Sequence, residues 1–316
     1  MNSHSSILIN TDLPLPVFYR GKVRDTYELD NLLLIITTDR ISAFDVVLPS
    51  GIPGKGRVLN QISVFWFNQT KHLAPNHLVE AIDDVHHLGN YLPTESRFPY
   101  PSYLAGRSMV VKKVKRIPVE CVVRGYLAGS GWAEYQQYGA VSGITLPKGL
   151  QQSQELPQPL FTPTTKAETG HDEPLTMGEV KGLVGEAIAE ELKEKSLAIY
   201  SYGREYAKAK GIIIADTKME FGLHDDRLIL IDELLTPDSC RFWDTSQYRI
   251  GQSQPSYDKQ LVRDWLIETG WNKEPPAPVL SPEVIASTTK IYEQAYERLT
   301  GRKIGGSSHP SPAHGF

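Results

Sequence analysis

Short apolar runs that alternate with polar turns mark the beginning of the chain. Residues 18–29 (FYRGKVRDTYEL) precede a polar turn at Asp30-Asn31, and residues 32–37 (LLLIIT) follow it. Runs of this length on either side of turn residues are typical of β-strands. The pattern therefore predicts a β-hairpin.

Three basic residues alternate with other residues in the first strand of this hairpin. Arg20, Lys22 and Arg24 are two positions apart, so they are predicted to share one face of the strand. A glycine-containing hairpin with a basic face can lie over phosphate groups. A solvated edge strand accounts for the same residues equally well, so the pattern alone leaves both interpretations open.

Further strands and helices follow from the same pattern. Residues 109–114 (MVVKKV) and 119–123 (VECVV) predict two strands, with Pro118 between them at a turn or an edge position. Residues 141–165 are rich in Pro and Gln and are predicted to form a loop. Apolar residues three and four positions apart predict helices. The predicted helices cover residues 58–72, 132–138, 176–211, a segment after Lys259, and residues 281–301. The helix 176–211 is predicted as one long helix that a capping box opens.

The middle of the chain predicts a second hairpin, in which charged residues continue directly from an apolar strand. Residues 212–215 (IIIA) and 228–231 (LILI) are the predicted strands, and a polar segment joins them. Asp216, Lys218 and Glu220 alternate after the first strand, so their side chains can line one side of the sheet.

Asp232 closes the second strand and adds a carboxylate to this group. Carboxylates that lie close together out of water need counter-charges. Magnesium takes one or two carboxylates together with substrate phosphates, so Asp232 with Asp216 or Glu220 is a candidate metal site. The turn at 236–239 would present Arg241 to the same place. An exposed hairpin with solvated charges is the alternative.

A third group of residues has the pattern of an anion site. Gly129 and Gly131 flank Ser130 immediately before the predicted helix 132–138, and Arg124 precedes them. Backbone N–H groups at a helix N-terminus favour anions, and an arginine offers two parallel hydrogen bonds to an oxyanion. Ser130 could instead serve as an N-cap residue of the helix.

Composition and charge restrict the class of protein. The 316 residues are 40% hydrophobic and 22% charged, which is ordinary for a soluble globular protein. The formal net charge of −4 disfavours a nucleic-acid-binding protein, and no apolar run approaches the length of a membrane span. Cys121 and Cys240 are far apart in sequence, and the N-terminus lacks the pattern of a signal peptide. We therefore expect a cytoplasmic protein. The pair His86-His87 has no partners at metal-ligand spacing.

Three strings in this sequence closely resemble one enzyme family. They are residues 216–222 (DTKMEFG), residues 231–243 (IDELLTPDSCRFW) and the VECVVR…GS pattern of residues 119–130. All three are similar to SAICAR synthetase, the phosphoribosylaminoimidazole-succinocarboxamide synthase of purine biosynthesis. The resemblance extends from Arg20 to about Arg298.

This resemblance implies a two-lobed α+β fold with ATP in the cleft between the lobes. Residues 1–118 would form a lobe with an antiparallel sheet that covers the nucleotide. Residues 119–316 would form a larger α+β lobe with the metal hairpin and the substrate site, and we expect the tail from about residue 303 to be disordered. The implied activity is an ATP-dependent ligase in the de novo pathway to IMP. It condenses carboxyaminoimidazole ribonucleotide (CAIR) with L-aspartate to SAICAR, ADP and phosphate through an acyl phosphate.

The resemblance also implies residue roles, because residues can be matched to the family motifs one by one. Residues 164–168 (TTKAE) and 171–173 (HDE) resemble family segments around the substrate site. The residues expected to take part in catalysis are Lys22, Lys218 and Asp232. Those expected to bind ATP are Lys22, Arg24, Lys113, Glu120, Lys218 and Glu220. Those expected to hold magnesium are Asp232, Asp216 and Glu220. Those expected to bind substrate are Asp45, which would orient the imidazole, and Arg124, Ser130, Arg241 and Lys259, which would bind its phosphate and carboxylate.

Two other classes of protein are compatible with parts of the pattern. A kinase is suggested by the VVKK strand and the acidic hairpin, but the HRD and DFG motifs of protein kinases are missing. A nucleotide sensor without turnover is the other class, and the intact set of lysines and carboxylates argues against it. ADP release that depends on both CAIR and L-aspartate would distinguish the ligase from both.

Overall fold

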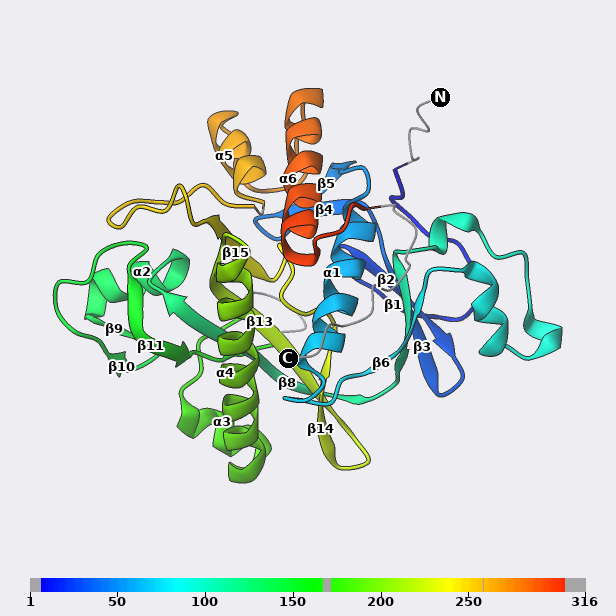
Figure 1. Ribbon diagram of the computed structural model, residues 1–316, viewed down its shortest axis with the longest axis horizontal. Helices are drawn as coiled ribbons and strands as arrows, with labels where there is room; N and C mark the ends of the chain where they lie inside the picture. The colour runs from blue at the N-terminus through cyan, green and yellow to red at the C-terminus, as the bar shows by residue number, and fades with distance from the viewer. Residues whose placement is uncertain (1–6, 167–171, 258, 305–316) are drawn as a thin grey trace.

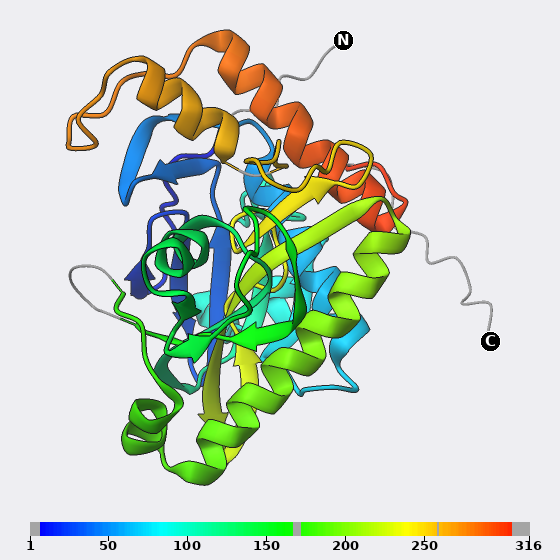
Figure 2. The ribbon, with the colours of Figure 1, turned by 90° about the vertical axis from the view of Figure 1, so that its left-hand side faces the viewer.

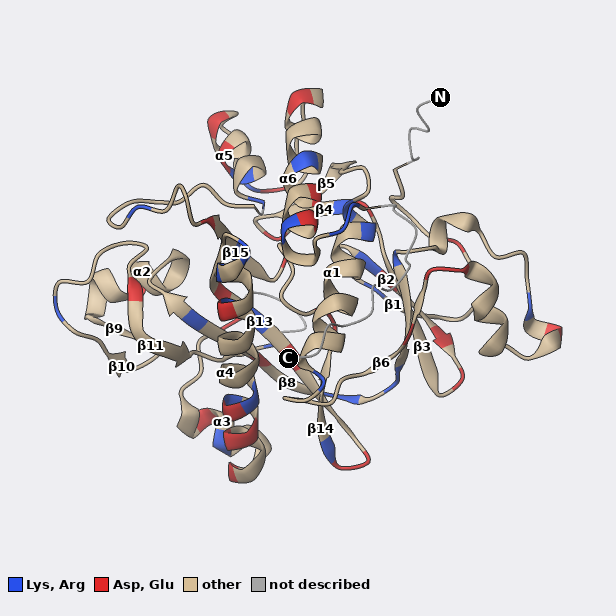
Figure 3. Cartoon of the chain, viewed as in Figure 1, with Lys and Arg blue, Asp and Glu red and all other residues tan. Residues whose placement is uncertain are grey.

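The computed structural model describes residues 7–166, 172–257 and 259–304. Two antiparallel sheets with helices packed on them make up most of this part of the chain (Figures 1 and 2). Acidic and basic residues are interspersed along the elements in the view of Figure 3. None of the helices in the described part of the chain combines the length and apolar composition needed to cross a bilayer. The tail predicted to be disordered lies almost entirely outside the described residues.

The first sheet is formed by the N-terminal part of the chain. Its strands follow the order β1-β2-β3-β7-β6, all antiparallel. Leu29 lies opposite Leu32, which confirms the predicted turn at Asp30-Asn31. The strands are β1 (Val17–Arg20), β2 (Arg24–Leu29), β3 (Leu32–Thr37), β6 (Leu78–Ile82) and β7 (Ser108–Lys112).

The segment predicted as the first strand of this hairpin is in fact two strands. The chain turns at Gly21, whose N–H donates to the carbonyl of Arg24 at 2.7 Å, and Arg20 lies opposite Asp25. Arg20 and Arg24 therefore belong to different strands, and Lys22 lies in the turn between them. The prediction that these three residues share one face is wrong, because a period-two argument holds only within one uninterrupted strand.

The second sheet carries the predicted central hairpin. Its strands follow the order β11-β8-β13-β14, and β12 and β15 pair with β8 and β13. The hairpin itself is confirmed, but its first strand continues through the polar residues that were predicted to connect the two strands. The turn is Asp225-Asp226, both with positive φ, as in a two-residue hairpin loop. The strands are β8 (Lys115–Tyr126), β11 (Glu155–Phe161), β12 (Thr164–Thr165), β13 (Ile212–His224), β14 (Arg227–Ile231) and β15 (Cys240–Asp244).

Two predictions about proline-containing segments are wrong. Pro118 lies inside β8 instead of between two strands, opposite the irregular pairing of β8 with β13 between Glu220 and Gly222. The predicted loop 141–165 contains β11 and β12, together with the short hairpin of β9 (Ala140–Val141) and β10 (Ile144–Thr145). β11 shifts register between Glu155 and Leu160, so its prolines are not required to donate ladder hydrogen bonds.

The predicted helices are present, with one interruption. The predicted long helix breaks at Gly185, which adopts φ of 87°, and Leu183 is consequently 55% exposed. The capping box of Thr176 and Glu179 and the Ser281 cap are confirmed. The helices are α1 (Lys55–Thr70), α2 (Gly129–Tyr138), α3 (Met177–Val184), α4 (Glu186–Ala209), α5 (Gln260–Glu268) and α6 (Pro282–Thr300).

One apolar core joins the two sheets. It includes side chains from β3 and β7 of the first sheet, from β8 and β13 of the second, and from α1, α4 and α6. The helix α4 runs along one face of the second sheet (Figure 2). A smaller core lies between α5, α6 and the hairpin of β4 (Arg40–Ala43) and β5 (Val46–Gly51). The boundary between the two lobes was predicted after residue 118, and this position lies inside β8.

Candidate active site

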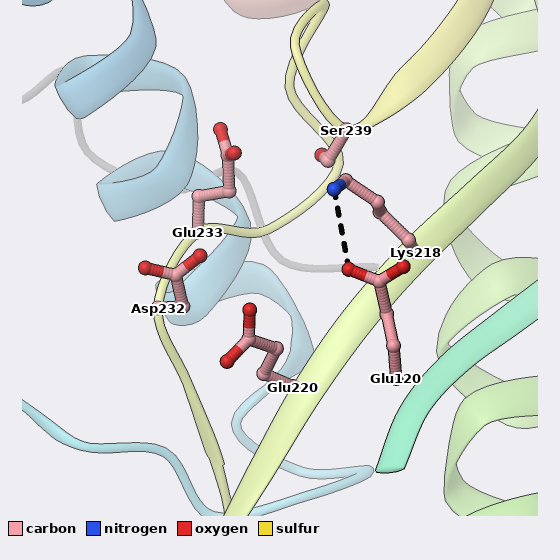
Figure 4. A pocket seen from close by; sticks show the side chains of 6 residues that line it. All are labelled: Glu120, Lys218, Glu220, Asp232, Glu233 and Ser239. Carbon is pink, nitrogen blue, oxygen red and sulfur yellow. Dashed lines mark hydrogen bonds and ion pairs between the residues drawn. The ribbon is translucent and has the colours of Figure 1, made fainter. Parts of the chain in front are cut away.

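Two neighbouring cavities that differ in volume and in the charge of their lining residues make up the candidate active site. The first has a volume of about 10 Å³, enough for one water or small ion, and we call it the acidic chamber. The second has a volume of about 350 Å³, and we call it the cleft. Lys218 and Ser239 line both. The acidic chamber is lined by Glu120, Lys218, Glu220, Asp232, Glu233 and Ser239 (Figure 4).

The acidic chamber owes its four carboxylates to strand register. Glu120 of β8 lies directly opposite Glu220 of β13, and the chain after β14 adds Asp232 and Glu233. Asp232 adopts φ of 68°, a left-handed conformation that non-glycine residues rarely adopt. The carboxyl groups of Glu220 and Asp232 face the same space (Figure 4). The sheet therefore brings together the carboxylates of Glu120 and Glu220, which are 100 positions apart in sequence.

Arg24 is the counter-ion of Asp232 and Glu233, two carboxylates of the acidic chamber. Its guanidinium lies 2.6 Å from Oδ2 of Asp232 and 3.2 Å from Oε1 of Glu233. Burial raises the pKa of Asp232, and Arg24 opposes this effect by favouring the ionised carboxylate. The strand β2 thus places a cation from the first sheet against the carboxylates of the second.

Lys166 neutralises the other two carboxylates of the acidic chamber, Glu120 and Glu220. It was not predicted as a site residue. Its Nζ lies 2.8 Å from Glu220 and 3.1 Å from Glu120, and Lys218 lies 3.2 Å from the same oxygen of Glu120. Burial alone would raise the pKa of Glu120, but Lys218 and Lys166 outweigh it and hold the pKa below its ordinary value. The signal for Lys166 in the sequence was its place in the TTKAE string.

The donor set of the chamber fits a magnesium ion that also binds phosphate oxygens. Among the described residues no group of three or more His, Cys, Asp or Glu side chains forms a metal cage. Magnesium does not need such a cage, because it binds proteins through one or two carboxylates and completes its shell with water and phosphate. Of the two partners predicted for Asp232, the structure places Glu220 beside it and Asp216 in the cleft.

Asp216 lies between two arginines of the cleft. Arg241 forms an ion pair with its carboxylate, and Nη1 of Arg124 lies 3.6 Å from the same oxygen. Arg124 also donates to Oγ of Ser130 at 3.0 Å and to Oγ1 of Thr162 at 3.1 Å. Ser130 lies in the first turn of α2 and does not cap it. Arg124, Ser130 and Arg241, all predicted to bind substrate, are thus brought together.

Lys22 and Asp45 also line the cleft and form an ion pair there. Nζ of Lys22 lies 2.5 Å from Oδ1 of Asp45. Asp45 and Phe44 form the two-residue turn between β4 and β5, and both have positive φ, 64° and 51°. Such turns usually contain Asn-Gly, so two larger residues here retain local strain, which is a feature of functional sites.

Arg40 anchors the turn that carries Lys22. Its buried guanidinium donates to the carbonyls of Lys22 at 3.0 Å, Gly21 at 2.9 Å and Ile9 at 2.6 Å. It also lies 2.7 Å from Oδ1 of the buried Asp25. A planar guanidinium with five N–H donors can satisfy three carbonyls and a carboxylate together, which the single point charge of a lysine cannot.

A buried ion pair supports the end of the cleft formed by the 236–239 turn. Lys55, which is completely buried, lies 2.8 Å from Oδ2 of Asp238, and the hydroxyl of Tyr292 donates to the other oxygen at 2.6 Å. Lys259, a predicted substrate ligand, lies 3.2 Å from the same carboxylate. Burial alone would raise the pKa of Asp238, but Lys259 and Lys55 hold it well below its usual range.

Lys113 is a predicted ATP ligand that lines neither cavity and, unlike Arg24, forms no ion pair with a residue of the acidic chamber. Its Nζ pairs with Glu28 at 2.8 Å and lies over the ring of Phe18, on the exposed side of the first sheet. The alternation of the VVKK strand did not reveal which side of the sheet its lysines occupy.

Comparison with known proteins identifies the family. The sequence model of SAICAR synthetase matches residues 17–278. The chain belongs to the SAICAR synthetase family.

Close relatives extend this match over almost the whole SAICAR synthetase chain. The phosphoribosylaminoimidazole-succinocarboxamide synthase of Thermodesulfovibrio yellowstonii is 52% identical over 299 residues, which cover 93% of this chain and 99% of the relative. That of Syntrophotalea carbinolica is 52% identical over 300 residues, 94% of this chain and 99% of the relative. The resemblance inferred from the sequence motifs is confirmed.

Solved SAICAR synthetase structures share the fold. The SAICAR synthase of Saccharomyces cerevisiae complexed with SAICAR matches with a TM-score of 0.86 and 44% identity, covering 94% of this chain and 99% of that one. A SAICAR synthetase in complex with ADP matches with a TM-score of 0.66 and 25% identity, covering 91% and 98%. The predicted two-lobed α+β SAICAR synthetase fold is therefore confirmed. The chain is an ATP-dependent ligase that condenses CAIR with L-aspartate to SAICAR in purine biosynthesis.

Proposed function

We propose that this SAICAR synthetase carries out its reaction at the junction of the acidic chamber and the cleft. The observation that supports this placement is that Lys218 and Ser239 line both cavities. A carboxylate-rich chamber suits a metal and the phosphates it binds, and a cation-rich cleft suits anionic substrates. A phosphoryl group at the junction would touch both.

The proposed chemistry has two steps. A carboxylate oxygen of CAIR attacks the γ-phosphorus of ATP, which forms an acyl phosphate and breaks the bond to ADP. The amine of L-aspartate then attacks the acyl carbon, loses a proton and displaces phosphate. Because phosphoryl transfer depends on positioning and charge neutralisation, the protein needs no nucleophile of its own.

Residues of the chamber are assigned to the metal and the phosphates. Asp232 and Glu220 would hold magnesium, which supplies positive charge to the phosphate oxygens when bound. Burial alone would lower the pKa of Lys218, but Glu120 outweighs it and keeps Lys218 protonated, so that it can neutralise the transferring charge. Lys22, in the turn between β1 and β2, lines the cleft and would add a second cation to the same phosphates.

Residues of the cleft are assigned to the ribonucleotide. Arg124, Ser130 and the first turn of α2 form a set of donors suited to a phosphate group, and Arg241 adds a second guanidinium. Asp45 and Lys259 face the same cleft and are assigned to substrate as well.

The assignment of the reaction can be tested directly by the release of ADP. Turnover is expected only when ATP, CAIR and L-aspartate are all present. ADP release that needs CAIR but not L-aspartate would indicate a kinase, which is the second class suggested by the sequence.

Lys22→Ala is expected to weaken ATP binding about ten- to a hundred-fold and to slow turnover. The change removes a cation proposed to contact phosphate oxygens, and such charge-assisted hydrogen bonds contribute about 1.5–3 kcal/mol. Equilibrium binding of ATP and the turnover rate measure the two effects. Lys113→Ala is the matched control, since Lys113 lines neither cavity. An equal loss in both variants would restore Lys113 as an ATP ligand, and no loss in Lys22→Ala would leave the β1–β2 turn without a role.

Arg40→Lys is expected to raise the KM for ATP about tenfold while the affinity for CAIR stays the same. Lysine keeps the charge beside Asp25 but cannot satisfy the carbonyls of Gly21 and Lys22 together, so the turn loses its position. Arg20→Lys is the control, because Arg20 contacts the same Asp25 but neither of these carbonyls. Equal effects of the two variants on the KM for ATP would show that Arg40 supports only the fold.

We also assign the enzyme to a reducing compartment, the cytoplasm. Cys121 and Cys240 are both buried and free. Burial raises the pKa of Cys121 to about 12, so the thiol stays protonated and unreactive. Buried free thiols of this kind are typical of proteins that are not exposed to oxidising conditions.

A further inference from the structure

Glu233 differs from the other carboxylates of the acidic chamber in the direction and the partners of its side chain. Its carboxyl group points away from that of Glu220 (Figure 4). Both of its oxygens have partners that do not line the chamber. Oε1 lies 3.2 Å from the guanidinium of Arg24, and Oε2 accepts a hydrogen bond of 2.5 Å from the hydroxyl of Thr236. Glu233 therefore connects a cation of the first sheet with the turn at 236–239.

The hydroxyl of Thr236 uses its full hydrogen-bonding capacity within the protein. A hydroxyl has one proton to donate and two lone pairs that accept. The proton is donated to Glu233, and Oγ1 accepts the backbone N–H groups of Asp238 at 3.2 Å and of Ser239 at 3.3 Å. Thr236 is completely buried, so the loss of its hydroxyl would leave buried polar groups without these partners.

The turn that Thr236 begins carries groups of both cavities. Asp238 lines the cleft, and Ser239 lines the cleft and the acidic chamber. The carbonyl of Ser239 accepts the backbone N–H of Lys218 at 3.0 Å, so the turn also contacts the lysine that lines both cavities. A shift of this turn would therefore change the distance between groups of the chamber and groups of the cleft.

The backbone that leads from the acidic chamber to this turn contains two residues in a left-handed conformation. Asp232 has φ of 68° and Leu235 has φ of 46°, on either side of Glu233. Residues other than glycine keep this conformation only where surrounding contacts hold it, and such residues cluster at functional sites. The contacts of Glu233 with Arg24 and Thr236 provide that support.

We propose that Thr236 is a positioning residue for phosphoryl transfer, whose hydroxyl fixes the turn at 236–239 to Glu233 of the acidic chamber. Thr236 lines neither cavity, so it acts through Glu233, Asp238 and Ser239. It holds the groups of the two cavities at the separation that the reacting atoms require. Such an effect changes the rate of the bound complex more than the affinity for either substrate. The inference rests on the proposed placement of the reaction at the junction of the two cavities.

Thr236→Val tests this role, because valine has the shape of threonine but no hydroxyl. The kcat is expected to fall about ten- to a hundred-fold, since a displacement of about 1 Å can lower the rate of a bound complex a hundred-fold. Equilibrium dissociation constants of ATP and CAIR should stay within about threefold of the wild type. Thr236→Ser restores the hydroxyl, so its kcat should lie within about threefold of the wild type.

Thr288→Val is the matched control for the loss of a buried hydroxyl. Thr288 is also completely buried, and its hydroxyl donates to the carbonyl of Val284 at 2.7 Å. It belongs to α6 and lines neither cavity, so this variant should keep its kcat. Circular dichroism verifies that each variant is folded, and Thr236→Ala takes the place of Thr236→Val if the valine variant does not fold.

An unchanged kcat in the variant without the hydroxyl would overturn the proposal. An equal loss of kcat in Thr236→Ser would overturn it too, because the effect would then belong to the methyl group. Losses of ATP and CAIR affinity as large as the loss of kcat, or an equal loss of kcat in Thr288→Val, would show that Thr236 supports only the fold. Failure of the wild type to require L-aspartate for ADP release would instead refute the proposed function itself.

Discussion

Asp232→Asn is expected to lower the turnover rate by about three orders of magnitude while the protein remains folded. Asparagine has the size of aspartate but lacks the charge that would hold magnesium opposite Glu220. Without the metal, the negative charge of the transferring phosphoryl group is left to Lys218 and Lys22. Asparagine also tolerates the left-handed backbone of this position, so the fold should not be strained. Steady-state rates across a magnesium titration, with circular dichroism, measure the two parts of this expectation.

The hairpin that carries Asp232 offers a matched control. Asp225→Asn makes the same change at an exposed aspartate of the β13–β14 turn, which also has a positive φ and lies outside both cavities. This variant should keep its full rate. Near-normal activity of Asp232→Asn at saturating magnesium would refute the assignment of the acidic chamber to the metal.

Arg124→Lys is expected to weaken CAIR binding about ten- to a hundred-fold and to leave the ATP dissociation constant nearly unchanged. The guanidinium contacts Ser130, Thr162 and Asp216 at once, and a lysine cannot reproduce this planar arrangement. Loss of a charge-assisted contact with a bound anion corresponds to about 1.5–3 kcal/mol. The rate should fall as well, because the same pocket positions the CAIR carboxylate near the γ-phosphate.

Separate equilibrium titrations of CAIR and ATP decide the outcome for this variant. Arg116→Lys is the control, because Arg116 is an exposed residue of the same strand, β8. If Arg124→Lys lost affinity for both ligands equally, Arg124 would have to support the fold or the nucleotide site, and the proposed ribonucleotide site would be misplaced.

The parts of the fold that could be predicted are those determined by local sequence. The turn at Asp30-Asn31, the capping box of Thr176 and the Ser281 cap all depend on residues within a few positions of one another. The interruption at Gly185 was missed because a glycine inside a helical pattern can either be tolerated or end the helix. The strand β11 was missed because its prolines suggest a loop, and only the partner strand β8 shows that the register avoids them.

The site was less predictable, because its contacts join distant parts of the chain. Alternation in β13 predicted that Asp216, Lys218 and Glu220 line one side of the sheet, and the structure places them in two adjoining cavities. It could not reveal that Asp216 pairs with two arginines of the cleft, whereas Asp232 pairs with Arg24. The contact between Arg24 and Asp232 spans 208 positions, so no local pattern could have indicated it.

The ion pair of Lys55 with Asp238 also affects the stage of synthesis at which the chain can complete its folding. Lys55 begins α1, whereas Tyr292, which donates to the same carboxylate, belongs to α6, and both helices contribute to the main core. During synthesis, the charges and apolar face of α1 therefore lack part of their cover until α6 has left the ribosome. The enzyme is thus expected to complete its folding only after α6 has emerged, and fragments that stop before Pro282 should be substrates for chaperones and proteases.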